Sequence, residues 1–100
     1  MQNTKLSYIE NDVSDIINKV STFYDITNQE LLTSNKADCV DARYSAINIL
    51  CDKYTDYDIN RATKLSKSCI NKIRNNFRDK IKNPYFRENY HKLCLQLENK

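Results

Sequence analysis

The residue types that carry most enzymatic chemistry are scarce in this chain of 100 residues, which has one histidine and no glycine. Phosphate-cradling loops, dinucleotide fingerprints and the sharp turn that exposes a serine nucleophile depend on glycine, because it adopts their backbone geometry without strain. The single histidine, His91, has no recognisable partner for general acid–base catalysis. We therefore expect neither an enzyme nor a small-molecule substrate.

The four cysteines lie too far apart to suggest a metal site. Cys39, Cys51, Cys69 and Cys94 are separated by 12, 18 and 25 positions, whereas zinc sites use closely spaced ligand pairs. Each lies on or beside an apolar stripe, where a free thiol packs as a small apolar group. We expect no metal, no cofactor and a reducing, cytoplasmic location, since residues 1–7 do not resemble a leader peptide and no apolar run is long enough to span a membrane.

The basic residues are concentrated in the second half of the chain. The net charge is +3, but residues 1–60 hold 5 basic and 10 acidic side chains, whereas residues 61–100 hold 11 basic and 3 acidic ones. Between Arg61 and Lys82 there are 8 basic residues and one acid, Asp79. Such a cluster indicates a surface for a polyanion such as a nucleic acid. The alternative is an ordinary solvated helix face.

The elements that position this cluster are expected to be helices. Apolar residues recur at helical spacing throughout, and a chain with one proline and no glycine is poorly suited to β-hairpins. The pattern predicts one all-α domain over residues 1–100 with about six helices. These span about 7–24, 38–53, 66–81 and 86–97, with short helices after Thr27 and Thr55.

Capping residues indicate where several helices begin. The predicted N-caps are Thr27, Asp38, Thr55 and Ser66. Thr27 and Thr55 each have an acidic residue three positions later, which is the spacing of a capping box. The helix that follows Ser66 is expected to stop at Asn83–Pro84, because the residue before proline is disfavoured in the α region.

Residues 56–81 have the layout of a helix-turn-helix, with a short helix, a break at 64–66 and a longer helix. Ile59, Leu65, Ile70 and Ile73 have the spacing that lets two such helices share a small core. A helix pair that serves packing alone is the alternative. With Ile70 and Ile73 inward, the opposite face is predicted to carry the residues that read DNA bases, Lys67, Ser68, Asn71, Lys72 and Asn75.

The remaining cations of the basic cluster are candidates for phosphate contacts, which supply affinity without sequence preference. Arg74 lies nearer the apolar side, where it either reaches phosphate or extends along the protein surface. The phosphate candidates are Arg61, Lys64, Arg74, Arg78, Lys80 and Lys82.

The order of these segments resembles the C-terminal DNA-binding domain of the bacterial replication initiator DnaA. The likeness is carried by IINKVSTFYDITNQELL from Ile16, by VDARYSAINIL with its Ala42-Arg43 pair, and by YDINRATKLSKSCINKIRNNF from Tyr57. The resemblance implies a helix-turn-helix related to that of the Trp repressor, with double-stranded DNA bound in the major groove. It also implies that Lys36, in the loop before the Ala-Arg helix, and Arg43 contact the DNA backbone.

The leading hypothesis is therefore a small double-stranded DNA-binding protein, bacterial or phage-encoded and nucleoid-associated, that acts in transcription regulation, replication or mobile-element maintenance. The alternative is a protein–protein interaction module that keeps the fold without binding DNA. The apolar stripe at 86–97 either forms a homodimer interface or completes the core of the monomer. No membrane partner is expected.

Overall fold

Six α-helices make up the protein, whose computed structural model describes residues 4–98. The predicted all-α fold is confirmed, and no strand occurs within the described range. The helices are α1 (Thr4–Tyr24), α2 (Asn28–Thr33), α3 (Ala37–Cys51), α4 (Asp56–Thr63), α5 (Lys67–Lys80) and α6 (Pro84–Glu98). None of these helices combines the length and the apolarity needed to cross a membrane.

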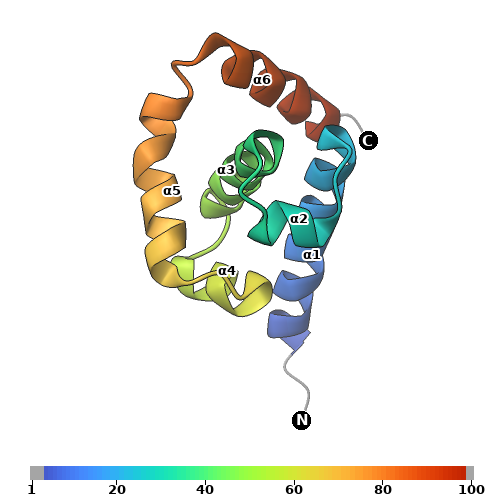
Figure 1. Ribbon diagram of the computed structural model, residues 1–100. Helices are drawn as coiled ribbons and strands as arrows, with labels where there is room; N and C mark the ends of the chain where they lie inside the picture. Colours follow the sequence, from blue (N-terminus) through green and yellow to red (C-terminus); the bar gives the residue numbers. More distant parts are fainter. Residues whose placement is uncertain (1–3, 99–100) are drawn as a thin grey trace.

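Helix α3 lies at the centre of the molecule and packs against α1, α2, α4 and α5 (Figure 1). It can occupy this position because its small and aliphatic side chains allow neighbouring helices to pack closely. Four of them are fully buried: Ala42, Ala46, Ile47 and Leu50. Burial of aliphatic side chains is the main favourable contribution to folding. Helix α5 packs on α3 away from α1, and α4 contacts α5, α3 and α1.

Three of the four predicted N-caps are confirmed. The Thr27 hydroxyl accepts the Glu30 N–H at 3.0 Å, and the Glu30 carboxylate accepts the Thr27 N–H at 2.9 Å, which completes the capping box. The hydroxyl of Thr55 and that of Ser66 each accept an N–H three residues later, at 3.2 and 3.1 Å. These caps set the start of α2, α4 and α5.

The prediction that Asp38 caps α3 is wrong. The helix begins at Ala37, and its N-cap is Lys36, which makes no side-chain capping hydrogen bond. Val40 donates its N–H to the Lys36 carbonyl at 2.9 Å, so the first helical hydrogen bond forms before Asp38 can act as a cap. Asp38 instead lies in the first turn, where a carboxylate still interacts favourably with the helix dipole.

Helix α6 packs against the rest of the protein through its apolar stripe. The Asn83 side chain accepts the Phe86 N–H at 3.1 Å, and Pro84 is the first residue of the helix. Phe86 and Leu93 are buried, and the Phe86 ring contacts those of Phe77 and Tyr90 at centroid distances of 5.7 and 6.1 Å. The centre of this stripe therefore completes the monomer core, and a homodimer through residues 86–97 stays a prediction.

The link between α4 and α5 contains a residue in the left-handed region. Lys64 has φ 70° and ψ 4° and ends α4, at a position where glycine is common because it has no Cβ. We expect Lys64→Gly to raise the free energy of unfolding by about 0.5–1 kcal/mol through relief of this backbone conformation. Urea denaturation measures the effect, with Lys64→Ala as a control that removes the same charge but keeps Cβ. Equal stability of the glycine and alanine variants would contradict the prediction.

A partly buried hydrogen bond joins α1 to Tyr54, which follows α3. The Tyr54 hydroxyl donates to Asp12 Oδ2 at 2.5 Å, and Lys53 Nζ lies 3.2 Å from the same oxygen. The Tyr54 hydroxyl, more than Lys53, lowers the pKa of Asp12, and the Asp12 carboxylate raises the pKa of Tyr54 to about 12. The pair is therefore stabilising only while Asp12 is ionised and Tyr54 is protonated.

This pair predicts a particular pH dependence of stability. A lowered Asp12 pKa contributes stability above its ordinary value of 3.8, which is lost as the pH falls through the lowered value. A raised Tyr54 pKa contributes stability that is lost as the pH rises from 10.0 to about 12. We expect Tyr54→Phe to unfold with less pH dependence at both ends when urea denaturation is compared at about pH 3, 7 and 11. Parallel pH profiles for the two proteins would show that the pair does not act in this way.

Candidate nucleic-acid interface

Helices α4 and α5 form a pair around a connection of three residues, 64–66. Ile59 of α4 and Ile70 and Ile73 of α5 are buried in the common core. The connection is fixed by polar contacts, since the Asn60 side chain donates to the Leu65 carbonyl at 2.6 Å and the Thr63 hydroxyl accepts the Leu65 N–H at 3.1 Å. The predicted short helix, break and longer helix are thus present, and the outer face of α5 has a defined orientation.

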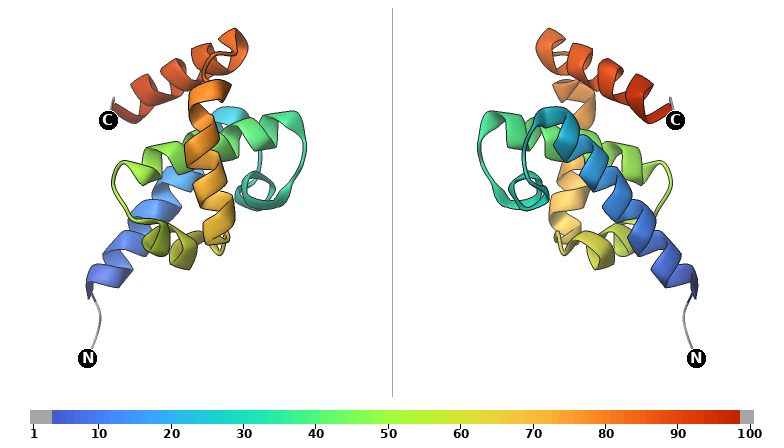
Figure 2. Two further views of the ribbon diagram at one scale, coloured as in Figure 1. Left: turned by 90° about the vertical axis from the view of Figure 1, so that its left-hand side faces the viewer. Right: turned by 90° about the vertical axis from the view of Figure 1, so that its right-hand side faces the viewer.

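The outer face of α5 is free of other helices. In Figure 2 (left), α5 crosses in front of the molecule, and no helix covers its outer side. The five residues predicted to read bases all lie exposed on this helix. Four of them line one open hollow together with Asp56: Lys67, Ser68, Asn71 and Lys72.

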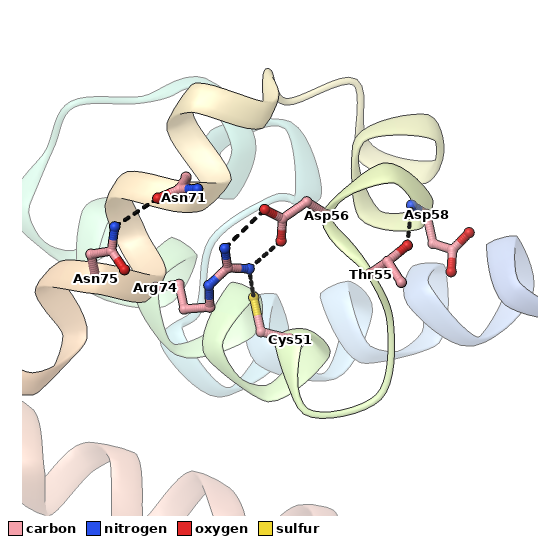
Figure 3. Close-up of polar contacts among 7 residues, drawn as sticks. All are labelled: Cys51, Thr55, Asp56, Asp58, Asn71, Arg74 and Asn75. Carbon is pink, nitrogen blue, oxygen red and sulfur yellow. Dashed lines mark hydrogen bonds and ion pairs between the residues drawn. The ribbon is translucent and has the colours of Figure 1, made fainter.

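The fifth, Asn75, is joined to the others through a side-chain hydrogen bond. Its amide nitrogen donates to Asn71 Oδ1 at 2.6 Å, one helical turn earlier (Figure 3). This contact aligns two amides along the helix surface, each with groups left for a ligand. The structure therefore brings all five predicted residues together on one face.

Arg74, for which the sequence left two alternatives open, has an ionic partner within the protein. Its guanidinium makes a two-point ion pair with the Asp56 carboxylate, and a guanidinium nitrogen lies 4.0 Å from Cys51 Sγ (Figure 3). Arg74 thus ties α5 to the first turn of α4 and to the end of α3. Asp56 pairs with its charge, but 41% of the Arg74 side chain is exposed, so a phosphate contact by Arg74 stays a prediction.

Lys80 is also held inside the structure. Its ammonium lies 2.7 Å from Asp41 Oδ1 and within 5.0 and 5.1 Å of the ring centres of Tyr44 and Phe86. Only 26% of its side chain is exposed. This cation therefore joins α5, α3 and α6, and its role as a phosphate contact stays a prediction.

The two residues to which the DnaA resemblance assigns DNA contacts lie on α3 and directly before it. Arg43 Nε donates to the Leu31 carbonyl at 2.7 Å, and its terminal nitrogen donates to the Ser34 carbonyl at 2.5 Å. Arg43 therefore satisfies carbonyls at the end of α2, a structural role. Lys36 is exposed at the start of α3 and stays a candidate.

Three of the remaining phosphate candidates are exposed and have no carboxylate within 4.0 Å among residues 4–98: Arg61, Lys64 and Arg78. Lys82 lies 3.6 Å from Asp79, but both side chains are at least 74% exposed, and such pairs contribute little. These four cations therefore flank the exposed face of α5 with charge that an anion can use.

Tyr57 is a residue of this surface that the sequence analysis missed. It is 52% exposed, and its hydroxyl oxygen accepts a hydrogen bond from Arg61 at 3.0 Å. The ammonium of Lys67 lies 5.1 Å from the centre of the same ring. The spacing of Tyr57 and Arg61, four residues apart in a predicted helix, was the signal that could have revealed the first contact.

The cysteines and the histidine are not gathered at one site within the described residues. Burial raises the pKa of the Cys51 and Cys94 thiols, which disfavours the reactive thiolate. Cys39 is buried and His91 is exposed. Within residues 4–98, no three histidine, cysteine or acidic residues lie close enough to hold a metal ion. Comparison with known proteins adds no further assignment, because no family model, curated protein or solved structure matches this chain.

Proposed function

We propose that the protein binds double-stranded DNA by placing the N-terminal half of α5 in the major groove. The observation that carries the proposal is the gathering of Lys67, Ser68, Asn71, Lys72 and Asn75 on one uncovered face of a helix whose other face is buried. The major groove admits a helix, and the early residues of such a helix reach base edges.

The side chains on this face suit the chemistry of the groove. An asparagine amide can both donate to and accept from adenine, and a lysine can donate to guanine acceptors. Asn71 and Asn75 supply the amides, and Lys72 supplies a cation without a carboxylate partner in the described structure. Sequence preference is accordingly assigned to these residues together with Ser68.

Affinity is assigned to the flanking cations Arg61, Lys64, Arg78 and Lys82. Each phosphate that a cation neutralises releases condensed counterions from the duplex, which makes binding sensitive to salt. The Arg74–Asp56 and Lys80–Asp41 pairs support the same function indirectly, because they hold α5 in place. No bond-making step is involved.

We further assign the α4–α5 pair as a helix-turn-helix of the Trp-repressor and DnaA type. This finer assignment rests on the sequence resemblance and on the order of short helix, three-residue connection and longer helix. The corresponding role is that of a bacterial or phage-encoded regulator, or of an accessory factor in replication or mobile-element maintenance.

Binding of the purified protein to random and AT-rich duplexes across a salt series tests this function. Contacts from four flanking cations predict that the logarithm of affinity falls with the logarithm of salt with a slope of about −3 to −4. Absence of binding to any duplex at low salt would overturn the proposal. The interaction module that keeps the fold without DNA binding would then be the better hypothesis.

A further inference from the structure

Tyr57, in the first turn of α4, is in contact with two cations at once. The Arg61 guanidinium carbon lies 5.6 Å and the Lys67 ammonium 5.1 Å from the centre of its ring. One arginine nitrogen also donates to the Tyr57 hydroxyl at 3.0 Å. A cation from α4 and a cation from α5 therefore both lie beside the same exposed ring.

No carboxylate forms an ion pair with these cations in the described structure, although Glu10 and Asp58 act on Arg61 from a greater distance and Asp56 lines the same hollow as Lys67. Neither Arg61 nor Lys67 has a carboxylate within 4.0 Å in residues 4–98. Two like charges held on one ring repel each other, and an aromatic ring offsets only part of that repulsion at an exposed site. An anion bound beside both cations would relieve this repulsion.

The free groups of the cluster are all hydrogen-bond donors. Arg61 donates one N–H to the Tyr57 oxygen and has further N–H groups available, and the Lys67 ammonium carries three N–H donors. The Tyr57 oxygen accepts from Arg61, which leaves its own O–H free to donate. A ligand that matches this set needs several acceptor oxygens and a negative charge, which describes the phosphate of a nucleic-acid backbone.

We infer that Tyr57, Arg61 and Lys67 form a binding site for one phosphate of the DNA backbone, in which the Tyr57 ring is a positioning element that holds the two cations together. The inference rests on the proposed DNA binding and deepens it. It also assigns Lys67 to the backbone, which leaves base reading to Ser68, Asn71, Lys72 and Asn75. A phosphate bound at this site would fix the N-terminal end of α5, where the base contacts begin.

A double-mutant cycle on duplex affinity tests the role of the ring. Tyr57→Leu is compared with Arg61→Gln/Lys67→Gln and with the triple combination, each over a salt series. We expect Arg61→Gln/Lys67→Gln to flatten the salt slope by about one to two units. Tyr57→Leu should weaken binding by about 3- to 10-fold in the wild-type background, but by less than about twofold once both cations are removed.

Two further variants separate this role from a general effect of losing an aromatic residue. Tyr85→Leu removes a ring of similar exposure, 64%, from α6 and should leave affinity unchanged. Tyr57→Phe keeps the ring and loses the hydroxyl, so its loss of affinity should be smaller than that of Tyr57→Leu. Thermal unfolding checks that each variant is folded.

The outcomes distinguish this inference from the proposed function. If the wild type binds duplex DNA but Tyr57→Leu behaves as Tyr85→Leu does, the phosphate site is overturned and DNA binding stands. The same holds if Tyr57→Leu weakens binding equally with and without the two cations. If the wild type binds no duplex, the proposed function itself fails.

Discussion

Replacement of Ser68, Asn71 and Lys72 by alanine together is expected to weaken binding to a selected duplex by about 100-fold and to remove most of its preference among sequences. Each good contact to a base edge contributes about 1–3 kcal/mol of discrimination, and these three residues line one hollow on the exposed face of α5. Because only one positive charge is lost, the salt slope should change by no more than about one unit. Affinity for selected and random duplexes, measured side by side, gives both quantities.

The chain offers a matched control for this variant. Lys19, Thr22 and Gln96 line a second hollow between α1 and α6 and supply the same kinds of group, a cation, a hydroxyl and an amide. Their replacement by alanine should leave affinity and sequence preference within about twofold of wild type, because contacts outside an interface contribute little to binding. Equal losses in the two variants, or unchanged sequence preference in the α5 variant, would contradict base reading by α5.

Phe86→Ala is expected to lower the free energy of unfolding by about 3–5 kcal/mol, the usual range for loss of a buried phenylalanine. Phe86 is 1% exposed and joins α6 to α5 through the ring of Phe77 and the cation of Lys80. A domain of this size has a total stability of about 5–15 kcal/mol, so the variant should be close to unfolding at elevated temperature. Urea denaturation at room temperature measures the change.

The neighbouring residue supplies the control for Phe86. Tyr85 precedes it in α6 and is 64% exposed, so Tyr85→Ala should change stability by no more than about 0.5 kcal/mol. A similar small effect for Phe86→Ala would mean that α6 is not packed on the rest of the protein. The apolar stripe at 86–97 would then be free for a second copy of the chain.

Most of the local structure follows from sequence because its causes are local. The Thr27–Glu30 box and the Ser66 cap act over three residues, and the stripes that bury Val20, Leu50 and Ile73 repeat at the helical period. The start of α3 differs from the prediction because its N-cap carries no local signal. Lys36 accepts the first helical hydrogen bond from Val40 through its carbonyl, and its side chain makes no capping contact that the sequence could reveal.

The exposed face of α5 could be predicted for the same reason, since burial of Ile70 and Ile73 sets the rotation of the helix. The ion-pair partners of the basic residues on α5 could not be predicted from the sequence. Arg74 pairs with Asp56 and Lys80 with Asp41, contacts that depend on how α4 and α3 pack against α5. A count of basic residues along the chain therefore does not show which cations have carboxylate partners within the protein.

Amide chemical-shift mapping of the protein during titration with a short duplex tests the placement of DNA on α5 most directly. Because binding through this helix brings phosphate and base edges next to α4, α5 and Lys82, the largest shifts should fall in residues 57–82, with α1 and the hollow at Gln96 nearly unchanged. Saturable shifts confined to that segment are the expected result. Shifts concentrated on α1, α3 or α6, with residues 67–75 unaffected, would contradict it.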